Sequence, residues 1–164
     1  MADELGKKFE SKLKEDFLKM GGATIDRLYD PVSGFHGICN VCDFIGYKFP
    51  FICYMECKTT KGNTFPLSRL TQYDSLIKKK GIKGVIAGVV IWFYDNDKIV
   101  FVPIDTIEKL LSDGEKSVNI RKFLNSGEEY AYNILELPSV KKRTFFDTDY
   151  TALLKYYEEN LKDE

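Results

Sequence analysis

Two acidic residues and a lysine in the first half of the chain have the types and spacing needed for metal-assisted hydrolysis. They are Asp43, Glu56 and Lys58. Side chains alternate along a strand, so Glu56 and Lys58 share one face. Met55 and Cys57 then point oppositely, into packing. A strand paired with this one in a hairpin can place Asp43 beside Glu56.

The expected chemistry follows from the charges of these groups. Two adjacent carboxylates repel each other unless a divalent cation binds, and their hard oxygen atoms favour Mg²⁺ or Mn²⁺. Such an ion polarises a phosphoryl oxygen and generates hydroxide from water, while the ammonium of Lys58 stabilises the developing charge. With such a metal, these residue types predict hydrolysis of a phosphodiester; the alternative is a solvated polar strand face without a catalytic role.

The elements that must position these residues are an amphipathic helix and two strands. Apolar residues recur every four positions from Leu5 to Met20, a pattern that predicts a helix ending at Gly21-Gly22. Glu10 lies within about 20° of the buried face of that helix. Strands are predicted for three ranges: Ala23 to Tyr29, Cys39 to Tyr47, and Phe51 to Thr59, the last two joined by a hairpin through Gly46 to Pro50.

The second half of the predicted core contains a helix and a fully covered strand. Ser68 can cap a helix running to about Lys80, with Gln72 on the border of its apolar face. The continuous apolar run Gly84 to Tyr94 is typical of a central strand buried on both faces. This order of elements predicts a three-layer α/β sandwich with a mixed sheet.

Three further elements are expected after the central strand. A strand covers Lys98 to Val102, and a capping box of Asp105 and Glu108 opens a short helix that ends near Gly114. Residues 115 to 137 have no clear pattern. A final helix runs from about Tyr150 to Leu161.

Two sequence blocks carry a family resemblance. An acidic residue on one strand and an ExK triplet on the next are typical of the PD-(D/E)xK nucleases. The segment Met55-Glu56-Cys57-Lys58-Thr59-Thr60-Lys61-Gly62-Asn63-Thr64-Phe65-Pro66-Leu67, followed by Gln72, closely resembles the core of RecU-type Holliday-junction resolvases. The block Gly6-Lys7-Lys8-Phe9-Glu10 matches as well. The resemblance covers roughly residues 5 to 112.

The resemblance implies a restriction-endonuclease-like fold and a homodimer that makes paired nicks across a four-way DNA junction with Mg²⁺ or Mn²⁺. Asp43, Glu56 and the backbone carbonyl of Cys57 would ligate the metal, and Lys58 would be the catalytic lysine. Glu10 and Gln72 would be supporting catalytic residues. The chain departs from the family before Asp43, where the loop is too short for the long stalk of those resolvases and Val41 and Cys42 replace hydroxyl-bearing residues.

Composition sets the wider limits. The 164 residues, 44 % of them hydrophobic, predict a single nuclease domain, with a core at about 5–112 and a C-terminal extension at 113–164. No stretch approaches a membrane span, and we expect a cytoplasmic protein without membrane contact. The net charge is −1, but residues 1 to 83 contain 14 Lys/Arg against 10 Asp/Glu. An anionic partner should therefore meet the N-terminal half.

Basic residues near the predicted site are candidates for binding DNA, because phosphate contacts need cations near the cleavage point. Those closest in sequence to the catalytic residues are Lys7, Arg27, Lys61 and Arg69. A second cluster, Lys141-Lys142-Arg143, either grips a DNA backbone or flanks a packed turn.

Cysteines offer a competing interpretation. Cys39-x2-Cys42 and Cys53-x3-Cys57 imitate a zinc site, but two residues four apart on one strand lie about 13 Å from each other, too far to share one ion. His36, the only histidine, belongs to a glycine-flanked loop and is expected to contact solvent or a phosphate. Two alternatives remain: a nuclease of the same fold acting on linear or damaged DNA in restriction or repair, and a non-catalytic, zinc-stabilised DNA-binding module.

Overall fold

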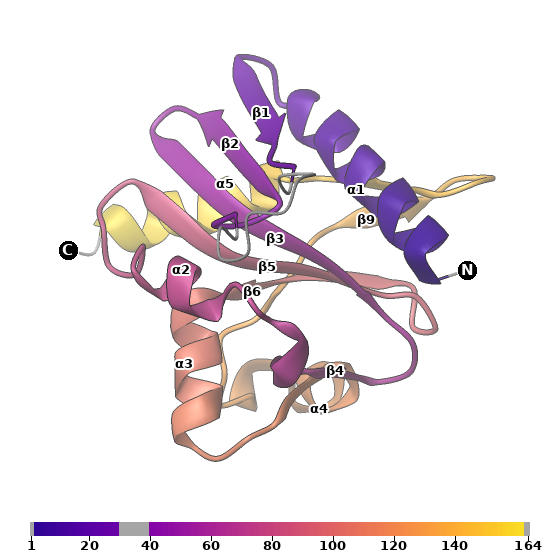
Figure 1. The fold of residues 1–164 in the computed structure, drawn as a ribbon, viewed down its shortest axis with the longest axis vertical. Coiled ribbons are helices and arrows are strands. Elements are labelled where there is room, and N and C mark those ends of the chain that lie inside the picture. Colours follow the sequence, from indigo (N-terminus) through magenta and orange to yellow (C-terminus); the bar gives the residue numbers. More distant parts are fainter. Residues whose placement is uncertain (1, 30–39, 163–164) are drawn as a thin grey trace, which may run out of the picture.

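The structure, a computed structural model, describes residues 2–29 and 40–162. A six-stranded sheet runs through it in the order β1-β2-β3-β5-β6-β8 (Figure 1). The helices and strands are α1 (Ala2–Leu18), β1 (Ala23–Arg27), β2 (Phe44–Lys48), β3 (Phe51–Thr60), β4 (Thr64–Pro66), the 3₁₀ turn η1 (Leu67–Arg69), α2 (Tyr73–Ile77), β5 (Val85–Phe93), β6 (Lys98–Pro103), α3 (Ile104–Ser112), β7 (Ser117–Asn119), α4 (Ile120–Ser126), η2 (Gly127–Glu129), β8 (Leu135–Glu136), β9 (Ser139–Lys141), β10 (Phe146–Thr148) and α5 (Thr151–Lys162).

The sheet is mixed, as the sequence predicts. β3 pairs in parallel with β5, and the other pairings within this sheet are antiparallel. A tight hairpin joins β2 to β3, with Lys48 opposite Phe51 and Phe44 opposite Met55. This hairpin confirms the predicted pairing of the strand next to Asp43 with the strand that contains Glu56 and Lys58.

Helices cover both faces of the sheet and enclose two hydrophobic cores. Alternate residues of β5 divide between them: Val90 and Trp92 pack with α1 and α5, whereas Val89 and Ile91 pack with α2 and α3. The predicted apolar stripe of α1 is buried, including Phe9 and Phe17. The three-layer α/β architecture is therefore confirmed.

Two local predictions are wrong. The helix expected from Ser68 to Lys80 is broken into η1 and the short α2, because Leu70 adopts a non-helical conformation (φ −90°, ψ 81°) that buries its side chain. The expected capping box does not form at α3, whose N-cap residue is Pro103. Asp105 lies inside the first turn, and its carboxylate accepts a hydrogen bond from the backbone N–H of its neighbour, Thr106.

The segment that the sequence leaves unassigned adds small elements around the second core. β7 pairs with β4, which follows the site-bearing strand β3, and β8 extends the sheet beyond β6. Asn119 caps α4 by accepting a hydrogen bond from the backbone N–H of Lys122 at 3.0 Å. These pairings join residues far apart in sequence, which explains why local patterns do not reveal them.

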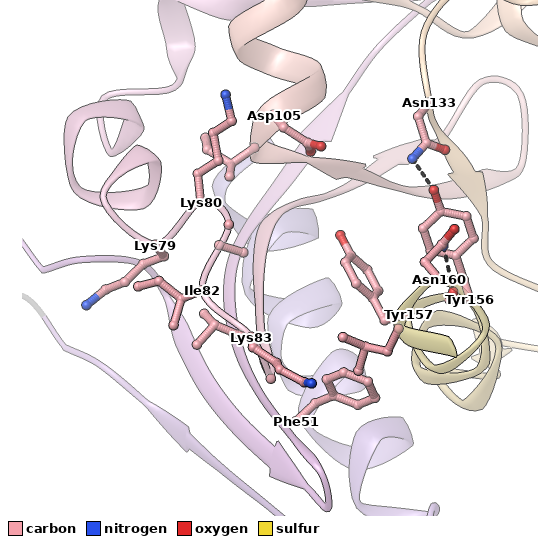
Figure 2. A pocket seen from close by; sticks show the side chains of 16 residues that line it. Phe51, Lys79, Lys80, Ile82, Lys83, Asp105, Asn133, Tyr156, Tyr157 and Asn160 are labelled. Carbon is pink, nitrogen blue, oxygen red and sulfur yellow. Dashed lines mark hydrogen bonds between the residues drawn. The ribbon is translucent and has the colours of Figure 1, made fainter. Parts of the chain in front are cut away.

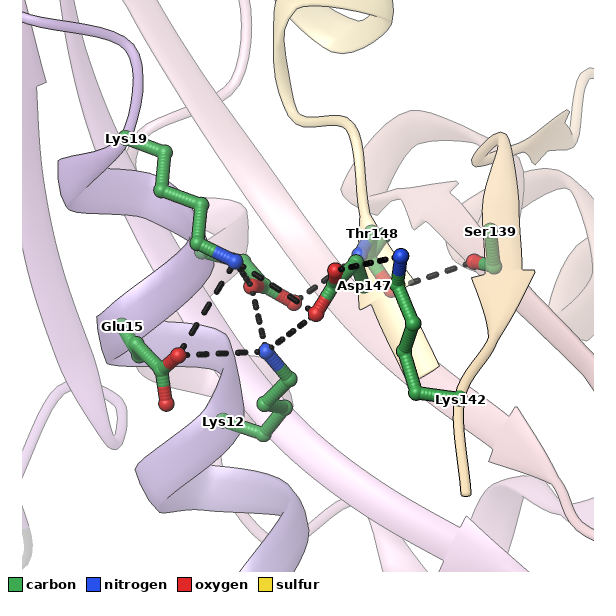
Figure 3. Close-up of polar contacts among 8 residues, drawn as sticks. Lys12, Glu15, Lys19, Ser139, Lys142, Asp147 and Thr148 are labelled. Carbon is green, nitrogen blue, oxygen red and sulfur yellow. Dashed lines mark hydrogen bonds and ion pairs between the residues drawn. The ribbon is translucent and has the colours of Figure 1, made fainter. Parts of the chain in front are cut away.

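A hairpin of β9 and β10 lies against α1 and is fixed there by a polar cluster (Figure 3). The Asp16 carboxylate, 1 % exposed, bonds Lys12 at 2.8 Å and Lys19 at 2.9 Å. Its second oxygen accepts the backbone N–H of Thr148 at 2.9 Å. The Asp147 carboxylate bonds Lys12 at 2.7 Å. The C-terminal segment is thus held in register with the first helix.

Candidate active site

The site forms where β2 and β3 separate. Asp43 stands immediately before β2, so it lies outside the observed strand, although the strand predicted from Cys39 to Tyr47 includes it. Pairing of β2 with β3 ends at Phe44 and Met55, so the next residues of β3 have no β2 partner. The N–H of Cys57 instead donates to the Asp43 carboxylate at 2.9 Å. The end of strand pairing therefore fixes one carboxylate against the exposed edge of β3.

Glu56 is the second carboxylate, and it is nearly removed from solvent. Its side chain is 1 % exposed; one oxygen bonds the Lys58 ammonium at 2.9 Å, and Oε2 is buried without a hydrogen-bond partner among the described residues. Burial and the negative charge of Asp43 raise the pKa of Glu56 to about 7, in spite of Lys58. Asp43 therefore repels the Glu56 carboxylate, as the sequence predicts for two neighbouring acids.

Arg27 connects Asp43 with the helix α1. Its guanidinium bonds Asp43 at 2.9 Å and Glu10 at 2.9 Å, and it stacks on the rings of Tyr29 and Phe44. Burial raises the pKa of Glu10, while the nearby Arg27 acts in the opposite direction. The sequence suggests Arg27 only as a DNA contact; the structure places it between two site carboxylates. Arg27 lies near the end of a predicted strand, and Glu10 and Asp43 are acidic residues that need a counter-charge. That combination in the sequence could have indicated the bridging role of Arg27.

A cavity of about 1170 Å³ opens above these residues. Several of the predicted catalytic and DNA-binding residues line it together: Lys7, Glu10, Arg27, Lys58, Lys61 and Arg69. Neither Glu56 nor Asp43 lines the cavity; each bonds a residue that does, Glu56 the Lys58 ammonium and Asp43 the Arg27 guanidinium. The Arg69 guanidinium donates to the carbonyl of Thr59 at 3.1 Å, which fixes that cation beside the end of β3. The cavity is therefore a cleft rimmed by cations, with Glu10 in its wall and with Asp43 and Glu56 bonded to two of the cations that line it.

The remaining predicted site residues lie elsewhere. Gln72 occupies the N-cap position of α2, accepts a hydrogen bond from Thr71, and does not line the cavity. On the β9–β10 hairpin, Lys141 pairs with Asp97 at 3.0 Å and Lys142 with Asp147 at 3.5 Å. The supporting role of Gln72 stays a prediction.

The cysteines behave as packing residues where the structure describes them. Cys42, Cys53 and Cys57 are free and buried, and burial raises the pKa of each thiol. Cys39 and His36 lie outside the described residues, together with most of the loop before Asp43. Within 2–29 and 40–162, no group of three or more His, Cys, Asp or Glu side chains is arranged to hold a metal ion.

A second cavity, of about 350 Å³, lies at the opposite end of β3 and β5. Figure 2 shows Asn133, Tyr156 and Asn160 on one wall and the lysines of the α2–β5 connection, such as Lys80, on the other. Asp105 is the one acidic residue among the described residues that line it. Asp43, Glu56 and Lys58 do not line this second cavity, so the chemistry predicted from the sequence is not assigned to it.

Comparison with known proteins identifies the fold but not a family. The sequence matches no protein-family profile and no curated protein. The structure is similar to that of Hjc, a Holliday junction resolvase from the archaeal hyperthermophile Archaeoglobus fulgidus, with a TM-score of 0.51 and 20 % sequence identity. The match covers 70 % of this chain and 88 % of Hjc. None of the described helices has the length and apolar character needed to cross a membrane.

Proposed function

We propose that this protein is a metal-dependent DNA endonuclease of the PD-(D/E)xK type that cleaves four-way junctions, as the RecU-like sequence blocks imply. The observation that carries the proposal is the convergence of Asp43, Glu56 and Lys58 at the point where β2 and β3 separate. The likeness of the fold to that of a Holliday junction resolvase supports it.

The donor groups fit a hard divalent cation. Oε2 of Glu56 is a buried polar atom without a hydrogen-bond partner among the described residues. The Glu56 carboxylate is also close enough to Asp43 for the two negative charges to repel each other. In an extended strand the N–H and C=O of one residue point to the same side, so the Cys57 carbonyl faces the same edge as the Asp43 carboxylate. These three groups would hold Mg²⁺ or Mn²⁺, with water completing the coordination.

A bound cation of this kind supplies Lewis acidity toward a phosphoryl oxygen and toward an attacking water molecule. The chain's own residues supply position and charge. Lys58 presents its ammonium to the cleft from the base of the site, where it can stabilise charge that develops on the phosphate. Arg27 orients Asp43, and Glu10 in turn holds Arg27. Glu10 and Arg27 are therefore positioning residues.

The substrate must present a phosphodiester backbone to this cleft. Lys7, Lys61 and Arg69 rim the cavity, and within the described residues none of the three has an acidic partner. Such cations bind phosphates without reading sequence. A four-way junction needs two cuts, which one cleft cannot make at once, so the proposal includes a homodimer with one site per subunit.

Cleavage of a synthetic four-way junction, compared with a linear duplex of the same sequence, tests the proposal. With Mg²⁺ or Mn²⁺ we expect cleavage of the junction, with chelator none, and with Asp43→Asn or Glu56→Gln a loss of at least about a hundredfold. The exposed Lys155→Ala on α5 serves as the matched control. If the protein cleaves no DNA in the presence of metal, the proposed nuclease activity is refuted. If it cleaves the duplex as fast as the junction, linear DNA and not the junction is its substrate.

A further inference from the structure

The β9–β10 hairpin presents a basic tip that the catalytic cleft does not use. Residues 142–145 form its turn, closed by a hydrogen bond from the Lys142 N–H to the Phe145 carbonyl. Lys142 is paired with Asp147, but Arg143 is exposed and makes no ion pair or hydrogen bond within the described part of the chain. A cation held at a turn without a counter-charge is available to an external anion.

The tip is held on a fixed support. Asp147 binds the hairpin to Lys12 of α1 and to Lys19 just after that helix, as Figure 3 shows. Asp16 of the helix pairs with the same two lysines. The buried bond from the Thr148 N–H to Asp16 sets the position of β10 along the helix. Because several charged groups share these contacts, the hairpin cannot slide along α1 without breaking them together.

Aromatic packing places the tip near the edge of the sheet that carries the active site. The ring of Phe145 lies 4.9 Å from that of Trp92, and Trp92 lies 5.7 Å from Tyr94. Tyr94 lines the catalytic cavity. The rings of Trp92 and Tyr94, together with the first turns of α1, therefore separate the hairpin tip from the cleft.

A shallow groove connects the two places over the outer surface of α1. Thr144 and Phe145 form one side of it, and α1 forms the other with residues that include Lys7 and Lys8. Lys7 also lines the catalytic cavity, so the groove and the cavity share a wall. The acidic residues of the groove are compensated: Glu4 pairs with Lys8 at 3.0 Å, and Glu15 pairs with Lys12 at 3.3 Å.

We propose that this groove and the hairpin tip form a second DNA-contact surface, in which Arg143 binds a backbone phosphate on the strand that leaves the catalytic cleft past Lys7. The inference rests on the proposed nuclease function and adds a path for the DNA. Lys7 lines the groove, and Arg143 precedes Thr144, which also lines it. Neither cation has an acidic partner among the described residues, so both charges favour an anion as the ligand. The connected groove favours a continuous phosphodiester chain over an isolated anion.

Binding of a fluorescent four-way junction in the presence of EDTA tests the path without catalysis. Arg143→Ala should weaken binding about three- to tenfold and reduce the slope of log affinity against log salt by about 0.9, the value for one lost phosphate contact. Arg143→Glu should weaken it further. The control for Arg143→Glu is Lys155→Glu, which makes the same change of charge at an exposed position of α5. Thermal melting of each variant verifies that it is folded.

The outcomes separate the two proposals. If the Arg143 variants bind like the Lys155 control while wild type still cleaves DNA, the second contact surface is refuted and the nuclease stands. If the wild-type protein neither binds nor cleaves DNA, both proposals fall. If the Arg143 variants lose affinity, a hydroxyl-radical footprint should also lose protection on one side of the cleaved phosphate. Unchanged protection there would overturn the path.

Discussion

Glu56 shows how one side chain can be both costly to the fold and useful to the site. Its carboxylate is buried beside Asp43, and among the described residues only one of its oxygens is satisfied, by Lys58. A group of this kind favours the neutral form until a cation arrives. The same unfavourable electrostatics that raise its pKa to about 7 therefore create an affinity for a divalent ion.

The metal-free protein should lose stability as the pH rises from about 5 to about 7. Glu56 has a pKa near 4.5 in the unfolded chain and about 7 in the folded protein. Between those values the folded state holds the extra proton, so raising the pH favours unfolding, and the effect levels off above 7. Thermal melting with EDTA across this range measures it.

Glu56→Gln should remove most of that pH dependence, and the exposed Glu158→Gln should leave it unchanged. Added Mn²⁺ should restore the wild-type melting temperature above pH 7. The same ion should have little effect on the Glu56→Gln variant, because its neutral amide lacks the charge that attracts a cation. A melting temperature that is equally pH-dependent in wild type and in Glu56→Gln would show that another group is responsible.

At the scale of the element, β5 illustrates how closely the central strands pack. Gly88 lies in this strand opposite Pro103, and a Cβ added there would come within 2.4 Å of the Val102 carbonyl oxygen and 2.6 Å of the Phe101 ring. The aromatic ring occupies the space that a side chain would need. Glycine is therefore required at this position by contact with the neighbouring strand β6.

Gly88→Ala should lower the free energy of unfolding by about 1–3 kcal/mol, the usual cost of overpacking a core. Gly6→Ala is the matched control, because nothing among the described residues lies within 4 Å of a Cβ added at that position of α1. Since alanine favours helix, that control should gain about 0.5–1 kcal/mol. Urea denaturation of both variants measures the difference, and equal stabilities would contradict the packing argument.

For the proposed junction nuclease, the number of nicks in one junction depends on how many subunits act together. Each chain offers one cleft of this kind in its described part, and resolution of a junction requires two nicks. We expect the 18.9 kDa chain to sediment as a dimer when bound to a junction.

Mixed dimers provide the sharper measurement. A dimer of one wild-type subunit and one Asp43→Asn subunit, purified with two different affinity tags, should nick one strand of the junction and leave its partner strand intact. Wild-type dimers carrying the same tags should cut both strands. Paired cuts by the mixed dimer, or a single chain per junction at all concentrations, would argue against the dimeric mechanism.

Strand periodicity and the apolar pattern are enough to predict the layered architecture and to place Asp43 near Glu56. Strand periodicity separates Glu56 and Lys58 from Met55 and Cys57, and the hairpin pairs the two acidic strands as predicted. The apolar run of β5 indicates burial on both faces, which the two cores confirm. These features depend on the period of a strand, a local property that the order of residues records directly.

Only the folded chain shows which groups bond the predicted carboxylates. The bridge from Arg27 to Glu10 and Asp43 joins three separate elements, and the break at Leu70 ends a helix that local propensity favours. The attachment of the β9–β10 hairpin depends on Asp16, more than a hundred residues away along the chain. Such contacts arise because distant segments come together when their apolar faces are buried, and no local periodicity encodes which charges then meet.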